Sequence, residues 1–376
     1  MNEVVRPEAA RPTPVSSGDA RDRGGKAQPI LTAENLRKYF PIHGGVLMRK
    51  IAVVKAVDDV SFMVLKGESL GIVGESGCGK STLARLLMCL TPRDAGSLVF
   101  DGDPIGGTSG LSLRELRRYM QIVFQDSDAS LNPRLTVEDS IAYGPRVHGM
   151  ASAEARALAR DLLQRVGLRP ELFGMRYPHE LSGGQKQRVN VARALALNPR
   201  LLILDEAVSA LDKSVAAQVL NLLRSLKRSF NLTYLFISHD LDVVQYISDR
   251  VLVMYLGQIV EIGPAEAIYR RPMHPYTRAL LNSRLALDPR DRVETAPLTG
   301  DPPNPINPPS GCRFRTRCPF AEPICAKAAP ALAKWVDRAS HVAACHMADR
   351  ASGHSRAGAA PPPLARHVRP EAIVSG

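Results

Sequence analysis

Residues 74–81 form the pattern G-x-x-x-x-G-K-S, whose residue types suit a phosphate-binding loop. Glycines let the backbone curl so that successive N–H groups point toward an anion. The lysine can reach the terminal phosphates of a nucleotide, and the serine hydroxyl can bind Mg²⁺. We expect nucleotide contacts from this loop and the next residue: Gly74, Glu75, Ser76, Gly77, Cys78, Gly79, Lys80, Ser81 and Thr82.

Two adjacent carboxylates, Asp205 and Glu206, follow the apolar run 201–204. Such a run is typical of a buried strand that ends at the ligand-binding edge of an α/β sheet. Asp205 is suited to hold Mg²⁺, and Glu206 to act as the base that polarises an attacking water. The pattern therefore predicts nucleotide hydrolysis.

The elements that must position these groups are visible in the hydrophobic pattern. Residues 69–73 read as a buried parallel strand before the loop, and residues 82–90 as a helix after it. Apolar runs at 201–204, 234–237 and 251–254 predict further strands of one sheet. Residues 111–180 read as mostly helical; within them, 152–166 has helical apolar spacing and stops at Gly167.

Composition agrees with a large α/β core plus an appendage in 376 residues. The formal net charge is +12, but the basic residues form no stripe interleaved with aromatics, so we expect no nucleic-acid partner. A surface near anionic lipid head groups fits this charge equally well. No apolar window of about 18 residues exists, so no membrane span is expected.

The ends of the chain lack apolar patterning. Residues 1–29 are rich in Arg, Pro, Ser, Gly and Ala, and we expect them to be disordered rather than a secretion signal. Residues 349–376 are expected to be disordered as well.

A second motif, Leu-Ser-Gly-Gly-Gln at 181–185, completes a resemblance to the ATPase subunits of ABC transporters over about residues 31–348. The resemblance implies a P-loop NTPase fold of the ABC type, with ATP and Mg²⁺ as ligands. It implies that Phe40 stacks on adenine and that Gln125 contacts Mg²⁺ and the water. His239 matches the residue that contacts the γ-phosphate.

The same resemblance implies that two ATPase subunits act together. The residues we call the signature loop are expected to press on the γ-phosphate held by the opposing subunit: Ser182, Gly183, Gly184 and Gln185. Residues 209–212 match the loop that crosses the subunit interface. The implied partners are a second ATPase subunit, in a heterodimer, two membrane-spanning permease subunits and, indirectly, a substrate-binding protein.

Several short sequence segments resemble the oligopeptide/dipeptide branch of ABC importers, in particular its second ATPase subunit. They are residues 129–134, 177–185, 274–277, 311–319 and 341–346. The branch implies an ATPase at the cytoplasmic face of the inner membrane that powers peptide uptake. Alternatives are a related importer for nickel or another small solute and, in a different class, a soluble ABC ATPase not coupled to transport.

Four cysteines follow a proline-rich linker at 297–310, namely Cys312, Cys318, Cys325 and Cys345. Their spacing, C-x₅-C-x₆-C-x₁₉-C, is neither that of a zinc ribbon nor that of a common ferredoxin. The branch resemblance implies a [4Fe–4S] cluster held by these four thiols. Zinc, with His341 and His346 as substitute ligands, and unligated reduced thiols remain alternatives.

The predicted organisation has an ABC ATPase domain at 30–264, containing a helical subdomain at about 126–190 that docks on the membrane subunit. A C-terminal extension with the cysteines follows at 265–348. The chain departs from the family pattern at Ala207, where proline is usual, and at Lys213, where valine is usual. Neither departure removes a catalytic group.

Overall fold

A computed structural model describes residues 28–44, 49–106, 110–283, 303–332 and 340–358. The predicted disordered ends lie outside these ranges except at 28–29 and 349–358. In the latter stretch His354 is buried, and its Nε2 lies 3.0 Å from the carbonyl oxygen of Phe320. The folded structure therefore continues past the predicted boundary at residue 348.

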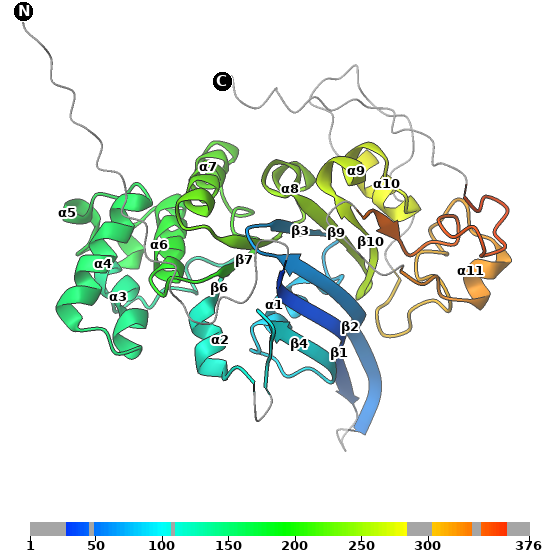
Figure 1. Ribbon diagram of the computed structural model, residues 1–376, viewed down its shortest axis with the longest axis horizontal. Helices are drawn as coiled ribbons and strands as arrows, with labels where there is room; N and C mark the ends of the chain where they lie inside the picture. Colours follow the sequence, from blue (N-terminus) through cyan, green and yellow to red (C-terminus); the bar gives the residue numbers. More distant parts are fainter. Residues whose placement is uncertain (1–27, 45–48, 107–109, 284–302, 333–339, 359–376) are drawn as a thin grey trace, which may run out of the picture.

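A mixed sheet forms the centre of the molecule (Figure 1). Its strand order is β11 (Val342–Ala343), β10 (Gln258–Pro264), β9 (Arg250–Tyr255), β3 (Ser69–Val73), β8 (Thr233–Ile237), β7 (Leu201–Asp205) and β6 (Met120–Val123). The five strands from β9 to β6 run parallel to one another. Strand β10 pairs antiparallel with β9, and β11 pairs antiparallel with β10. Because parallel strands end at one edge, the segments that follow β3, β7 and β8 meet there.

The predicted α/β fold class is confirmed, and the apolar runs at 69–73, 201–204, 234–237 and 251–254 all lie in these strands. Every residue of β3, β7, β8 and β9 is buried. This explains why the runs are continuously apolar instead of alternating.

A second, antiparallel sheet lies on the other side of α1 (Lys80–Leu87). Its order is β2 (Arg49–Leu65), β1 (Pro29–Gly44), β4 (Ala95–Phe100) and β5 (Asp103–Pro104). Leu83 and Leu87 of α1 join one buried cluster with residues of both sheets. The sequence predicted this helix at 82–90. In the structure it begins two residues earlier, directly after Gly79, and ends at Leu87.

The helical region occupies one side of the molecule, at the left of Figure 1. It contains α3 (Val137–Val147), α4 (Ser152–Arg165), α5 (Pro170–Phe173), the 3₁₀ turn η1 (Pro178–Glu180) and α6 (Gly183–Leu195). The predicted helix at 152–166 corresponds to α4, and Gly167 after it has a left-handed φ of 77°. The helix α2 (Leu113–Tyr119) leads into β6, and α7 (Lys213–Ser229) follows β7.

Four helices complete the fold: α8 (Leu241–Ile247), α9 (Ala265–Arg270), α10 (Pro275–Asn282) and α11 (Pro323–Lys327). The segment near α11 returns to the central sheet, because β11 pairs with β10 and Phe314 joins the main buried cluster. None of the helices in the described ranges is long and apolar enough to cross a bilayer.

Candidate functional site

The phosphate loop connects β3 to α1 as the sequence predicts. Gly79 has a φ of 109°, and a Cβ there would lie 2.1 Å from the Ala56 carbonyl oxygen, so only glycine fits. Lys80 Nζ donates hydrogen bonds to the carbonyl oxygens of Gly74 at 2.7 Å and Glu75 at 3.0 Å. The lysine head is thus held over the loop whose N–H groups are to bind phosphate. Cys78 is buried in the loop.

The carboxylate at the end of β7 lies beside the serine of the loop. Ser81 Oγ donates to Asp205 Oδ1 at 3.1 Å, although 124 residues separate the two in sequence. Burial raises the pKa of Asp205; the Ser81 hydrogen bond lowers it, and the neighbouring Glu206 raises it further. A hydroxyl and a buried carboxylate in contact are hard oxygen donors of the type that Mg²⁺ prefers, so these residues fit the implied ion.

Glu206 is the meeting point of three segments. It has a left-handed φ of 51°, a conformation that is uncommon for a non-glycine residue and typical of functional sites. Its Oε2 accepts a hydrogen bond from Gln125 Nε2 at 3.0 Å and lies 3.2 Å from His239 Nδ1. The structure therefore brings together Glu206 and Gln125, both predicted to contact the attacking water, and His239, predicted to contact the γ-phosphate.

The signature loop begins α6 through reciprocal hydrogen bonds. Ser182 Oγ accepts from the backbone N–H of Gln185, and Gln185 Oε1 accepts from that of Ser182, which forms a capping box. A Cβ on Gly184 would lie 2.5 Å from Val215, so α7 packs closely there. Among the described residues, no hydrogen bond or ion pair joins this loop to the phosphate loop. Figure 1 shows α6 among α3–α5, away from α1.

Phe40 is exposed on β1, with Lys38 Nζ 5.5 Å from its ring centroid. It pairs across the antiparallel sheet with Val54 on β2, two residues before the Ala56 carbonyl that contacts Gly79. An exposed ring near the phosphate loop is compatible with stacking on a nucleotide base.

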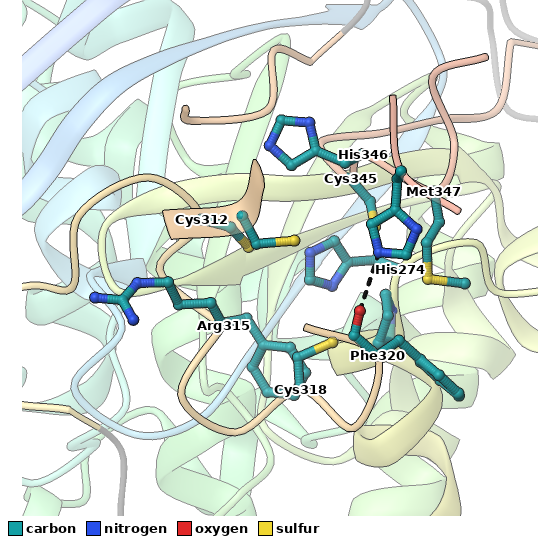
Figure 2. A pocket seen from close by; sticks show the side chains of 12 residues that line it. His274, Cys312, Arg315, Cys318, Phe320, Cys345, His346 and Met347 are labelled. Carbon is teal, nitrogen blue, oxygen red and sulfur yellow. Dashed lines mark hydrogen bonds between the residues drawn. The ribbon is translucent and has the colours of Figure 1, made fainter. Parts of the chain in front are cut away.

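The four C-terminal cysteines line one cavity, and the side chains of Cys312, Cys318 and Cys345 point into a common space (Figure 2). The cavity is small: the volume open to a water-sized sphere is only about 10 Å³. Within the described part of the chain, no group of three or more His, Cys, Asp or Glu residues is placed to hold a metal ion.

The prediction of a [4Fe–4S] cluster at Cys312, Cys318, Cys325 and Cys345 is therefore wrong, and the zinc alternative fails for the same reason. Burial raises the pKa of Cys318 to about 12 and that of Cys345 to about 11. All four are free thiols.

His274 lines the same cavity, and its buried imidazole should make the free energy of unfolding depend on pH. Burial lowers its pKa from 6.5 to about 4, against a smaller opposing effect of the Glu261 carboxylate. Between these values only the unfolded chain binds the proton, so the free energy of unfolding should fall as the pH falls from 6.5 toward 4.

His274 Nδ1 caps α10 by accepting a hydrogen bond from Tyr276 N, a role that Asn can also fill without titrating. Urea unfolding at pH 7 and pH 5 should therefore show a smaller loss for His274→Asn than for the parent; equal losses would contradict the assignment.

Two contacts to the phosphate loop were not anticipated from the sequence. The Tyr276 hydroxyl accepts a hydrogen bond from Glu75 N at 2.9 Å, and Arg317 forms an ion pair with the Glu75 carboxylate at 3.0 Å. Tyr276 belongs to the segment 274–277, whose sequence indicates only the importer branch. Arg317 lies in the segment 311–319, which also indicates the importer branch, but nothing in the sequence points to its pairing with Glu75, 242 residues away.

Comparison with protein families gives two matches. The ABC transporter family model matches residues 57–209, and the model of the oligopeptide/dipeptide transporter, C-terminal region, matches residues 260–325.

Similar full-length proteins include the oligopeptide transport ATP-binding protein AppF of Bacillus subtilis. It is 51% identical over 324 residues, which are 85% of this chain and 98% of the relative. The probable peptide ABC transporter ATP-binding protein y4tS of Sinorhizobium fredii is 48% identical over 348 residues, 92% of this chain and 94% of the relative.

Two similar solved structures share the fold. The ATP-binding cassette MJ0796, in a dimeric post-hydrolysis state bound to ADP and Pi, has a TM-score of 0.54 and 28% identity, covering 62% of this chain and 98% of its own. CbiO1 from Clostridium perfringens, part of the ABC transporter complex cbiONQ, has a TM-score of 0.55 and 28% identity, covering 68% of this chain and 96% of its own.

The chain has a phosphate loop, paired carboxylates and a signature loop in this fold, and it shares about half of its residues with AppF. The chain therefore belongs to the ATP-binding proteins of the ABC transporter family.

Proposed function

We propose that the chain is the ATP-hydrolysing subunit of an ABC importer for di- and oligopeptides. The observation that carries the chemistry is the Glu206 carboxylate, contacted by both Gln125 and His239 beside the Ser81–Asp205 pair. The similar proteins AppF and y4tS are named as oligopeptide transport and probable peptide ABC transporter ATP-binding proteins, which supports a peptide as the substrate.

Each side chain has a defined role in this proposal. The loop from Gly74 to Thr82 binds the phosphates, with Lys80 at the β- and γ-phosphates, and Phe40 stacks on adenine. Ser81, Gln125 and Asp205 would hold Mg²⁺, which when bound neutralises charge on the phosphates.

Hydrolysis begins when Glu206 accepts a proton from a water whose oxygen bonds to the γ-phosphorus. The bond between the γ-phosphorus and the bridging oxygen breaks, which releases ADP and phosphate. His239, next to Glu206, donates to the γ-phosphate oxygens.

The ATPase site is completed by a second cassette. The N-terminus of α6, with the signature loop, is separate from the chain's own phosphate loop, so it is available to the nucleotide of a partner. We assign this partner to a similar but different chain, and residues 209–212 to the interface between the two.

The helical region is the proposed dock for a permease subunit. This chain would bind peripherally there, at the cytoplasmic face of the inner membrane. Several large apolar side chains of the helical region are exposed, which is typical of interaction sites. They are Tyr143, Val147, Leu172, Met175 and Tyr177, with Met175 72% exposed.

Reconstitution tests this function. The isolated chain should hydrolyse ATP slowly. Adding a second cassette and two permeases should raise the rate, because the signature loop is then supplied in trans. A pentapeptide with its binding protein should raise it again. The same complex with Lys80→Ala is the control and should be inactive. High, peptide-independent turnover by the dilute isolated chain, or stimulation by nickel instead of peptide, would contradict the proposal.

A further inference from the structure

Besides the Tyr276 contact, the C-terminal extension reaches the phosphate loop through a bidentate ion pair. Arg317 Nη1 lies 3.0 Å from Glu75 Oε2, and Nη2 lies 3.1 Å from Glu75 Oε1. Only 5% of the Arg317 side chain and 22% of the Glu75 side chain are exposed, so water screens the pair weakly. Paired N–H···O bonds of this kind are both strong and geometrically specific.

The segment that carries Arg317 is fastened firmly beside the loop. Phe314 is 1% exposed, and its ring centroid lies 5.4 Å from that of Tyr255 and 5.5 Å from that of Tyr276. Arg313 pairs with Asp58 and donates to the Leu256 carbonyl oxygen. Arg317 therefore approaches Glu75 from a packed scaffold, not from a free tail.

The charge of Glu75 makes this contact consequential. Glu75 directly follows the first loop glycine, and its carbonyl oxygen accepts from Lys80 Nζ at 3.0 Å. An uncompensated carboxylate on this loop residue would repel the negative charges of ATP, and this repulsion is strong where water is partly excluded. The Arg317 guanidinium, which remains charged at all relevant pH values, offsets that carboxylate.

We infer that Arg317 is a positioning residue for ATP: it neutralises Glu75 and holds the phosphate loop, so that the C-terminal extension completes the nucleotide site. This inference rests on the nucleotide site proposed above. It assigns the extension a part in the ATP site of its own chain, in addition to any contact with other subunits.

The test measures the Kd of MgATP by calorimetry on the full chain. Arg317→Met should raise the Kd about tenfold, equivalent to about 1.4 kcal/mol, because the Glu75 charge is left uncompensated. Arg317→Lys, which keeps the charge but loses the fork geometry, should show a smaller rise. The neighbouring Arg315→Met removes a cation whose hydrogen bonds go to Ser310 instead, so its Kd should match the parent.

A charge role is separated from a merely structural one by the double variant. Arg317→Met combined with Glu75→Gln should bind MgATP as tightly as Glu75→Gln alone, since no carboxylate remains to be neutralised. If the double variant is as weak as Arg317→Met, or if Arg317→Met binds like the parent, the inference is wrong.

Lys80→Ala distinguishes a failure of this inference from a failure of the site itself. Loss of binding in Lys80→Ala together with parent-like binding in Arg317→Met would overturn only the role of Arg317. Parent-like binding in Lys80→Ala would overturn the proposed site and the inference together.

Discussion

Replacing Glu206 with Gln is expected to lower ATP turnover in the assembled transporter by about 10²–10⁴-fold, the usual effect of removing a positioned base. The amide has nearly the same shape as the carboxylate but cannot take a proton from water. The proposed phosphate contacts come from the loop and Lys80, so the Kd of ATP should stay close to that of the parent. Steady-state phosphate release and calorimetric binding measure the two effects separately.

The control is the same substitution at Glu154, an exposed residue in the first turn of α4. Glu154→Gln changes the net charge equally but is far from the carboxylates at the end of β7, so its turnover should match the parent. Retention of most activity by Glu206→Gln would show that another group accepts the proton.

Arg250→Met is expected to destabilise the fold by about 3–5 kcal/mol, the usual cost of removing one partner from a buried ion pair. Arg250 Nη1 lies 2.6 Å from Glu68 Oε1, and the two side chains are only 2% and 1% exposed. Glu68 stands in the turn between β2 and β3, and Arg250 begins β9, so the pair joins that turn to the central sheet. Urea unfolding monitored by circular dichroism measures the change.

A matched control is available on the surface. Arg270 and Glu266 also form an ion pair, at 3.0 Å, but their side chains are 67% and 73% exposed. Water and salt screen this pair, so Arg270→Met should cost less than about 1 kcal/mol. Combining Arg250→Met with Glu68→Gln should recover part of the lost stability, because the unpaired charge is removed as well. Equal effects of the two single arginine variants would contradict the role assigned to burial.

The sequence alone was sufficient where the chemistry is local. The phosphate loop needs a strand, a glycine-rich turn and a helix in direct succession, and each appears as a contiguous pattern between Ser69 and Leu87. The capping box at Ser182 and Gln185 depends on residues three apart, so it too can be read from spacing. The buried strands were predictable because a parallel sheet covered on both faces requires continuous apolar runs.

The tertiary structure decided what depends on distance and burial between remote segments. Family resemblance implied that Gln125 and His239 lie at the nucleotide, but not that both contact Glu206. The pairing of Arg317 with Glu75 was not implied at all. Family resemblance implied a cluster at the four cysteines, but in the described part of the chain their placement does not form a set of metal ligands. Ionisation and pairing depend on desolvation and on distances of a few ångströms, which the folded chain sets and which residue spacing does not encode.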